Sequence, residues 1–251
     1  MKSERQTSWA VYITNIGWNG AWLEPSKVSA EDRPRQPDAT GRTRTSSQHW
    51  RTFVKNHARG IVACDFLVAV TVRFQVIYIF LAMEVGSRRI LHYNVTAHPT
   101  ADWTLQQFRE AIPSNHPYQF LIHDRDSIFS PELDEELNGS FGLRVLRTPV
   151  RAPKANAYCE RLIGTVRREC LDFMIPLNER HLRITLGSWV THYNQGRPHS
   201  SLDPGIPEKT LDNPRSRPKS HRHRLPRDCE IRARDILGGV HHEYWLEQGA
   251  A

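Results

Sequence analysis

Three acidic residues stand where their carboxylates could act together. Asp65 lies within a run of apolar residues, Asp124 directly follows another, and Glu160 falls near the start of a segment with helical periodicity. An ionised carboxylate in apolar surroundings is costly unless a cation or a hydrogen-bonding partner balances it. Carboxylate oxygens are the ligands that Mg²⁺ and Mn²⁺ prefer. The three acids could therefore hold two divalent ions, an arrangement that supports in-line displacement at a phosphate.

Each acid also has a purely structural interpretation. Asp65 could be a satisfied buried group, Asp124 a turn or capping residue, and Glu160 a charge that favours a helix N-terminus. Considered one at a time, Asp124 and Glu160 favour this simpler interpretation. Their spacing argues for the chemical one, because thirty-five residues lie between Asp124 and Glu160.

This spacing resembles the DDE integrase-core family of retroviral integrases and bacterial insertion-sequence transposases. The family places an aspartate in a first strand, a second after a later strand, and a glutamate 35 residues on in a helix; Asp65, Asp124 and Glu160 fill these places. Asp126 stands where the family often has glycine, and its use as the ligand would break the spacing, so Asp124 is the expected ligand. The resemblance covers roughly residues 50–208 and includes three local segments: His123–Asp126, Ala152–Ala157, and Tyr193-Asn194 followed by Arg197-Pro198-His199 and Leu202.

The resemblance implies a metal-dependent enzyme that cleaves the ends of a mobile DNA element and joins them to target DNA. Asp65, Asp124 and Glu160 would hold two Mg²⁺ or Mn²⁺ ions, and the protein would act as a homo-oligomer on paired DNA ends. Arg167 stands seven residues after Glu160, on the same helix face, and is expected to contact a DNA phosphate. Lys154 and Arg151 are further candidates for DNA contact. Solvated surface charges are the alternative for all three.

The elements that must position the acids can be read from hydrophobic periodicity and from turn residues. Apolar, β-branched segments predict strands, three of them consecutive and antiparallel, and periodic segments bounded by Thr, Ser, Pro or Gly predict helices. The order indicates an α/β, RNase H-like three-layer fold with a mixed five-stranded sheet flanked by helices. The predicted strands are residues 60–74, 75–85, 89–95, 118–123 and 143–147, and the predicted helices are 100–113, 130–139, 155–174 and 179–194.

Composition divides the chain into three regions. Residues 1–47 are rich in Pro, Arg, Ser and Thr after residue 24, a composition that predicts a poorly structured arm. One interpretation of this arm is a truncated region that binds the element's ends. Residues 48–208 form the predicted integrase catalytic core. Residues 209–251 predict a basic linker followed by a small strand or hairpin around Gly238 and Gly239. Full-length members of the family usually carry helix-turn-helix modules, and residues 1–47 show no such pattern.

The bulk composition limits the partners and the compartment. Lys and Arg outnumber Asp and Glu by 34 to 27, which gives a formal charge of +7 and favours a polyanionic partner such as DNA. The four cysteines form no C-x-x-C pair, so reduced thiols and a cytoplasmic location are expected. No apolar run is long enough to span a membrane. Two rivals remain: a degenerate transposase fragment that binds DNA without transposing, and an RNase H-like nuclease acting on RNA–DNA hybrids.

Overall fold

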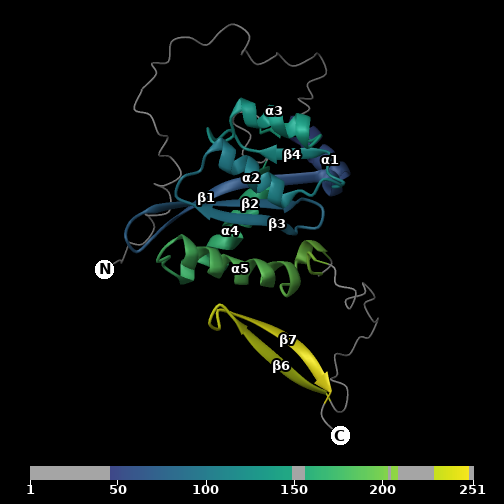
Figure 1. The fold of residues 1–251 in the computed structure, drawn as a ribbon. Coiled ribbons are helices and arrows are strands. Elements are labelled where there is room, and N and C mark those ends of the chain that lie inside the picture. The colour runs from purple at the N-terminus through teal and green to yellow at the C-terminus, as the bar shows by residue number, and fades with distance from the viewer. Residues whose placement is uncertain (1–45, 149–155, 203–204, 209–228, 249–251) are drawn as a thin grey trace, which may run out of the picture. The chain divides into compact units, whose positions relative to one another are not determined.

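A computed structural model of the protein describes residues 46–148, 156–202, 205–208 and 229–248 (Figure 1). All of them belong to one compact unit, Thr45–Ala251. The predicted arm up to residue 45 and the predicted basic linker at 209–228 lie outside the described residues.

A mixed five-stranded sheet forms the centre of this unit, as the sequence predicts. Ala63 of the central strand pairs antiparallel with Met83 on one side and parallel with Ile122 on the other. The three consecutive antiparallel strands are confirmed. The strands are β1 (Ile61–Val70), β2 (Val76–Glu84), β3 (Ile90–Thr96), β4 (Phe120–His123) and β5 (Arg144–Arg147), in the order β3-β2-β1-β4-β5.

Helices cover both faces of the sheet. Alternate residues of β1 point to opposite faces, so Ile61 and Ala63 join one buried cluster and Val62 and Cys64 join the other. The first cluster contains residues of α1, α4 and α5, and the second contains residues of α2 and α3; Figure 1 shows α3 and α5 on opposite sides of the sheet. The predicted three-layer arrangement of a mixed five-stranded sheet between helices is confirmed. The helices are α1 (Ser46–His57), α2 (Ala101–Ala111), α3 (Pro131–Ser140), α4 (Ala157–Glu169) and α5 (Glu179–Gln195), with 3-10 turns η2 (Ala58–Gly60), η4 (Leu171–Phe173) and η5 (Ser200–Leu202).

Local capping explains where the helices begin. The side chains of Thr100, Ser130 and Asn178 accept backbone N–H groups at the starts of α2, α3 and α5. Helix α1 has no counterpart among the helices that the sequence predicts. Its Trp50, Phe53 and Val54 have helical spacing, and Phe53 packs edge-on against Phe120 of β4 at 5.1 Å between ring centroids.

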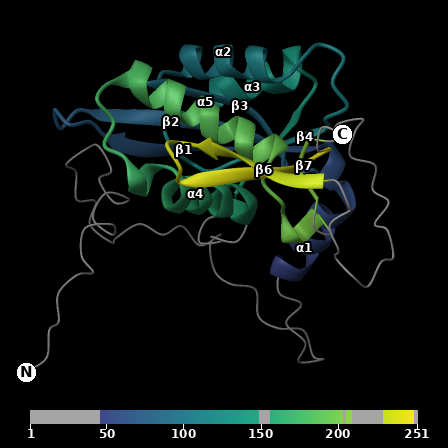
Figure 2. The same cartoon turned by 90° about the horizontal axis from the view of Figure 1, so that it is seen from below.

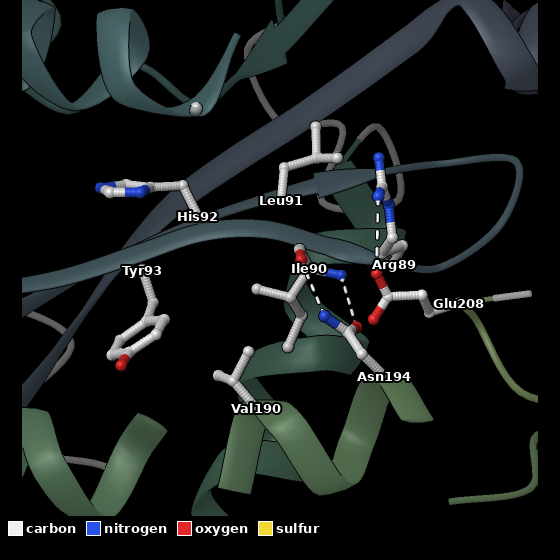
Figure 3. Close-up of a pocket in the computed structure, with 9 residues that line it drawn as sticks. Arg89, Ile90, Leu91, His92, Tyr93, Val190, Asn194 and Glu208 are labelled. Atoms are coloured by element: carbon white, nitrogen blue, oxygen red, sulfur yellow. Dashed lines mark hydrogen bonds and ion pairs between the residues drawn. The ribbon is translucent and has the colours of Figure 1, made fainter. Parts of the chain in front are cut away.

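The edge strand β3 is covered by α5. The Asn194 amide accepts the backbone N–H of Ile90 and donates to its carbonyl, each at 2.9 Å, so it takes the place of a neighbouring strand. A pocket of about 410 Å³ lies beside this contact, and Figure 3 shows Asn194 directed at Ile90 while Arg89 faces Glu208. Asp65, Asp124 and Glu160 do not line this pocket.

The last described residues form a hairpin of β6 (Cys229–Ile236) and β7 (His241–Gln248). Its turn contains Gly238 and Gly239, both with positive φ, a conformation that glycine adopts without strain. The Glu243 carboxylate binds His192 of α5 at 2.9 Å and also pairs with Arg234. None of the helices in the described ranges is long and apolar enough to cross a membrane.

We expect Glu243→Ala to loosen the contact between this hairpin and α5, where the stacking of His241 on His192 would remain. The substitution removes the partner of His192 and Arg234, and a charge-assisted hydrogen bond of this kind contributes about 1.5–3 kcal/mol. Amide hydrogen exchange in β6 and β7 should become about tenfold faster or more. Glu230→Ala is the control, because the described ion pair of the Glu230 carboxylate is with Arg232, inside the hairpin itself. Equal exchange rates in the two variants would contradict this role of Glu243.

Candidate active site

Asp65 is the fifth residue of β1 and shares the sheet face that α4 and α5 cover. Its side chain is partly buried, and its Oδ1 accepts the backbone N–H of Phe66 at 2.8 Å. Its Oδ2 lies 3.4 Å from Nδ2 of Asn156, the residue before α4. The rigid central strand thus fixes where this carboxylate stands.

Asp124 follows the last residue of β4. Strands β1 and β4 run parallel, and Ala63 of β1 lies opposite Ile122 of β4. Asp65 and Asp124 each follow these residues by two positions, so they lie in the same register. Oδ1 of Asp124 accepts the backbone N–H of Asp126 at 3.0 Å. The carboxyl ends of strands in α/β sheets are where reacting groups commonly collect.

Asp126 has a local structural task. Its Oδ1 accepts the backbone N–H of Ile128 at 3.0 Å and lies 3.4 Å from the Ser127 hydroxyl, so the carboxylate closes the turn after β4. Asp124, in register with Asp65 at the end of β4, is therefore the better placed of the two to act with Asp65.

Glu160 lies in the first turn of α4. Its side chain is exposed, and partial loss of hydration raises its pKa. The negative charge of Glu160 also raises the pKa of Asp65, which indicates that the helix brings it into range of the strand carboxylates.

The surroundings of the three carboxylates disfavour their ionisation. Burial, followed by the charge of Asp124, raises the pKa of Asp65 to about 8, and only the Phe66 N–H lowers it appreciably. Burial likewise raises the pKa of Asp124. Within the described ranges, no group of three His, Cys, Asp or Glu side chains is arranged closely enough to hold a metal ion. The three carboxylates are therefore close enough to affect one another's pKa, but their side chains do not converge on a common metal position.

Asn156 is a site residue to which the sequence analysis gave no role. Its side chain is 4% exposed, and Nδ2 lies 3.3 Å from the carbonyl of Cys64 and 3.4 Å from the carboxylate of Asp65. Its buried Oδ1 has no hydrogen-bond partner among the described residues. Asn156 thus connects the start of the Glu160 helix to the strand that carries Asp65. Only its place in the Ala152–Ala157 segment signalled it in the sequence.

A hydrogen-bonded network centred on Asp134 holds the end of β4 beneath Asp124. His123 is fully buried, its Nε2 lies 3.0 Å from Asp134 of α3, and its ring stacks on Phe129 at 4.3 Å. Asp134 also pairs with Arg147 at the end of β5. The network ties together β4, β5 and α3, and so limits the movement of Asp124.

We expect Asp134→Ala to destabilise the protein by about 3 kcal/mol, because it leaves His123 buried without its partner and breaks the pair with Arg147. Urea unfolding followed by circular dichroism measures this. Glu135→Ala, at an exposed position of the same helix, should change the free energy of unfolding by less than about 0.5 kcal/mol. Similar losses in both variants would mean that the network does not hold the strand.

The basic residues predicted to contact DNA are only partly described. Arg167 lies on α4, partly exposed and seven residues after Glu160, and it forms no ion pair with another described residue. Lys154 and Arg151 lie outside the described residues.

The segment from Tyr193 to His199 makes contacts that stabilise the fold. The Arg197 guanidinium donates to both carboxylate oxygens of Glu169 in α4, from Nε at 2.8 Å and from Nη2 at 2.5 Å. His199 is buried, and its Nε2 lies 3.2 Å from the carbonyl of Tyr193. The segment therefore fixes the end of α5 against α4, the helix that carries Glu160.

Comparison with known proteins agrees with this architecture. Residues 142–207 match the integrase core domain. The chain is 26% identical over 139 residues to the putative transposase InsD for insertion element IS2E of Escherichia coli (strain K12), covering 52% of this chain and 63% of that protein. The same identity and length relate it to the transposase InsD for insertion element IS2A/D/F/H/I/K of Escherichia coli, of which the match covers 46%. The chain thus spans about half the length of these relatives.

The fold is similar to that of a chain in the structure of the simian T-cell lymphotropic virus intasome in complex with the PP2A regulatory subunit B56 gamma. The TM-score is 0.51 at 12% identity, covering 74% of this chain and 66% of that one. The resemblance to transposase and integrase cores that the sequence indicates is confirmed by these matches.

Proposed function

We propose that this protein is a DDE-type polynucleotidyl transferase that cleaves DNA and joins DNA strands in transposition. The observation that carries the proposal is the cluster of Asp65, Asp124 and Glu160 on an RNase H-like core, where no described cationic side chain balances Asp65. The similarity to InsD transposases and to the integrase core domain supports the same reaction class.

The donor set fits divalent ions. Carboxylate oxygens are hard ligands, and Mg²⁺ usually takes only one or two of them and completes its shell with waters and substrate phosphate oxygens. The raised pKa of Asp65 means that its ionised form is disfavoured in the protein alone, and a bound cation would favour that form. Asp65, Asp124 and Glu160 would therefore hold two Mg²⁺ or Mn²⁺ ions when DNA phosphate is present. Bound there, such ions lower the pKa of water and offset the charge that develops on the phosphate.

The protein's own residues supply the positioning. Asn156 would fix the rotamer of Asp65, and the network of His123 with Asp134 would hold Asp124 in place. Glu160 would approach from a helix that Arg197 ties to α5 through Glu169. Arg167 would bind a DNA phosphate along the same helix face, and Lys154 and Arg151 are further proposed contacts.

The proposed reaction needs no covalent bond to the protein. Water attacks a phosphorus at the end of the element, and the bond to the 3′-oxygen breaks, which frees a 3′-hydroxyl. That hydroxyl then attacks a phosphorus of the target strand, forms a new phosphodiester and releases a 3′-hydroxyl from the target. DNA at the element ends and at the target would be the partner in both steps.

Strand transfer with a pre-cleaved duplex that carries a free 3′-hydroxyl tests the proposal. We expect joined products with Mg²⁺ or Mn²⁺ and none with a chelator, and a parallel reaction with an RNA–DNA hybrid separates strand transfer from hybrid cleavage. A folded protein that binds the duplex and yields no joined product would favour the degenerate fragment. Cleavage of the hybrid alone would favour the nuclease.

A further inference from the structure

The first turn of α4, which carries Glu160, has no local cap. Asn156 stands at the N-cap position, but its side chain accepts no backbone N–H of the helix, because its amide turns toward Cys64 and Asp65. The first four N–H groups of a helix have no partner within the helix, and a side-chain cap normally satisfies one of them. The start of α4 therefore depends on contacts with other elements.

One such contact comes from the turn between β2 and β3. The guanidinium of Arg88 lies over the ring of Tyr158, in the first turn of α4, with 3.9 Å between Cζ and the ring centroid. Both side chains are partly buried. Nη1 of Arg88 is buried and has no hydrogen-bond partner among the described residues. The contact with the aromatic ring therefore offsets the burial of this charge, and a cation–π contact is strongest where water is excluded.

The backbone of Arg88 has a conformation that arginine rarely adopts. Its φ is 67°, in the left-handed region that glycine and asparagine tolerate. The turn is fixed there, because the Arg88 N–H donates to the carbonyl of Glu84 at 2.9 Å. It is also packed against η2, since a Cβ on Gly86 would stand 3.1 Å from the carbonyl oxygen of Ala58. Backbone strain of this kind persists where the side chain has a task that the surrounding structure supports.

Arg88 also lies within electrostatic range of the end of α5. Helices α4 and α5 lie on the same face of the sheet (Figure 2). Burial raises the pKa of Tyr193 in α5 to about 12, and the positive charges of Arg197 and Arg88 oppose this rise. One guanidinium thus stands where the β2–β3 turn, the start of α4 and the end of α5 meet.

We propose that Arg88 is a positioning residue for Glu160, because its contact with Tyr158 holds the first turn of α4 in place. Tyr158 precedes Glu160 by two residues in the same turn, so a movement of the ring moves the carboxylate with it. A misplacement of about 1 Å can slow an enzyme roughly 10²-fold. The inference rests on the proposed function and deepens it, since it names a residue outside the carboxylate cluster on which the reaction depends.

Amide hydrogen exchange of the full chain, measured with a chelator present, tests whether Arg88 holds the helix start. Arg88→Asn removes the cation and suits the left-handed backbone, so its unfolding temperature should equal that of the wild type. In the helix the amides of residues 161–164 donate to the carbonyls of residues 157–160. We expect these amides to exchange about fivefold faster in the variant. Arg73→Asn, at an exposed arginine of the β1–β2 connection, is the matched control and should exchange as the wild type does.

Two further variants test the contact itself. Arg88→Lys keeps a cation that can lie over the ring, so it should restore most of the protection. Tyr158→Leu should speed exchange at residues 161–164 as Arg88→Asn does, and the double variant should add little, because both changes remove the same contact. Fully additive effects of the two changes would mean that Arg88 does not act through Tyr158, and the proposal would be wrong.

Strand transfer by the same variants shows whether the held helix serves the reaction. We expect kcat of Arg88→Asn to fall about tenfold with an unchanged KM for the pre-cleaved duplex, and Arg88→Lys to recover most of the rate. A raised KM with unchanged kcat would mean that Arg88 contacts DNA directly, which would overturn the proposal.

The exchange measurement decides the proposal even without activity. Unchanged exchange at residues 161–164 would overturn it, as would equal acceleration throughout the chain with a lower unfolding temperature, the sign of a merely structural role. A folded wild type without strand transfer would refute the proposed function, whereas the exchange rates would still show whether Arg88 positions the turn that carries Glu160.

Discussion

Glu160→Gln is expected to abolish strand transfer, with a loss of at least ~10³-fold, while leaving the fold intact. The substitution keeps the size of the side chain and removes the negative charge that a divalent ion requires. Glu160 is exposed in the first turn of α4, and no described hydrogen bond of its side chain holds the fold together. Single-turnover rates on the pre-cleaved duplex, measured beside the thermal unfolding midpoint, check both parts of the prediction.

Glu135→Gln is the matched control, because Glu135 is an exposed helical glutamate on α3, away from the carboxylate cluster. It should react at the wild-type rate. If Glu160→Gln retained more than about a tenth of the wild-type rate, Glu160 would not be a metal ligand, and its place in the first turn of α4 would be explained by the helix dipole alone.

Asp65→Asn is expected to abolish the reaction and, in the absence of divalent ions, to make the protein more stable. The native state holds the Asp65 carboxyl where burial and the charge of Asp124 disfavour ionisation, with a pKa of about 8 against 3.8 in the unfolded chain. At neutral pH the wild type must therefore fold with an unfavourable proton uptake. Asparagine keeps the shape and avoids this cost, so the gain should be on the order of a few kcal/mol.

The pH dependence of this gain follows from the two pKa values. Between pH 3.8 and about 8 the native state holds the Asp65 proton and the unfolded chain has lost it, so the native state binds more protons. The free energy of unfolding of the wild type therefore falls as pH rises through this window, and the fall ends above about pH 8. The advantage of Asp65→Asn should be absent below the unfolded pKa and largest above pH 8.

Urea unfolding with a chelator, at several pH values from 5 to 9, measures the difference between the two proteins. Asp102→Asn, at an exposed position in the first turn of α2, should change stability by less than about 1 kcal/mol at every pH. Adding Mn²⁺ should raise the unfolding temperature of the wild type and leave that of Asp65→Asn unchanged. If the Asp65→Asn protein were less stable than the wild type at pH 8, the Asp65 carboxyl would not carry the unfavourable free energy that its raised pKa implies.

The sequence predicts most of the sheet and its helices because their signals are local. Hydrophobic runs define β1 to β5, and Thr100, Ser130 and Gly196 mark helix ends in a way that short-range hydrogen bonding explains. Helix α1 could not be predicted because only three apolar residues in a polar segment mark it. Its stability depends on tertiary packing, such as that of Phe53 on Phe120.

The site was predictable only where spacing carries information. Asp65, Asp124 and Glu160 stand at recognisable intervals, whereas Asn156 and Asp134 act through contacts with residues 91 and 11 positions away in the chain. A buried amide or carboxylate leaves no pattern in the neighbouring sequence, because the residues that it contacts are brought to it by the tertiary fold. The same limit explains why the turn-closing role of Asp126 emerged only from its hydrogen bonds with Ser127 and Ile128.

The cover on edge strand β3 bears on how copies of this protein can meet. An open strand edge is a template to which a strand of another molecule can add, the first step of many aggregates. Asn194 occupies both hydrogen-bonding groups of Ile90, and Arg183 donates to the carbonyl of Val95 near the other end of the strand. Two side chains of one helix thus occupy backbone groups near both ends of this edge strand. A foreign strand would have to displace both side chains before it could pair along β3, so we expect copies that meet at this edge to join through side-chain surfaces and to separate without disturbing the sheet.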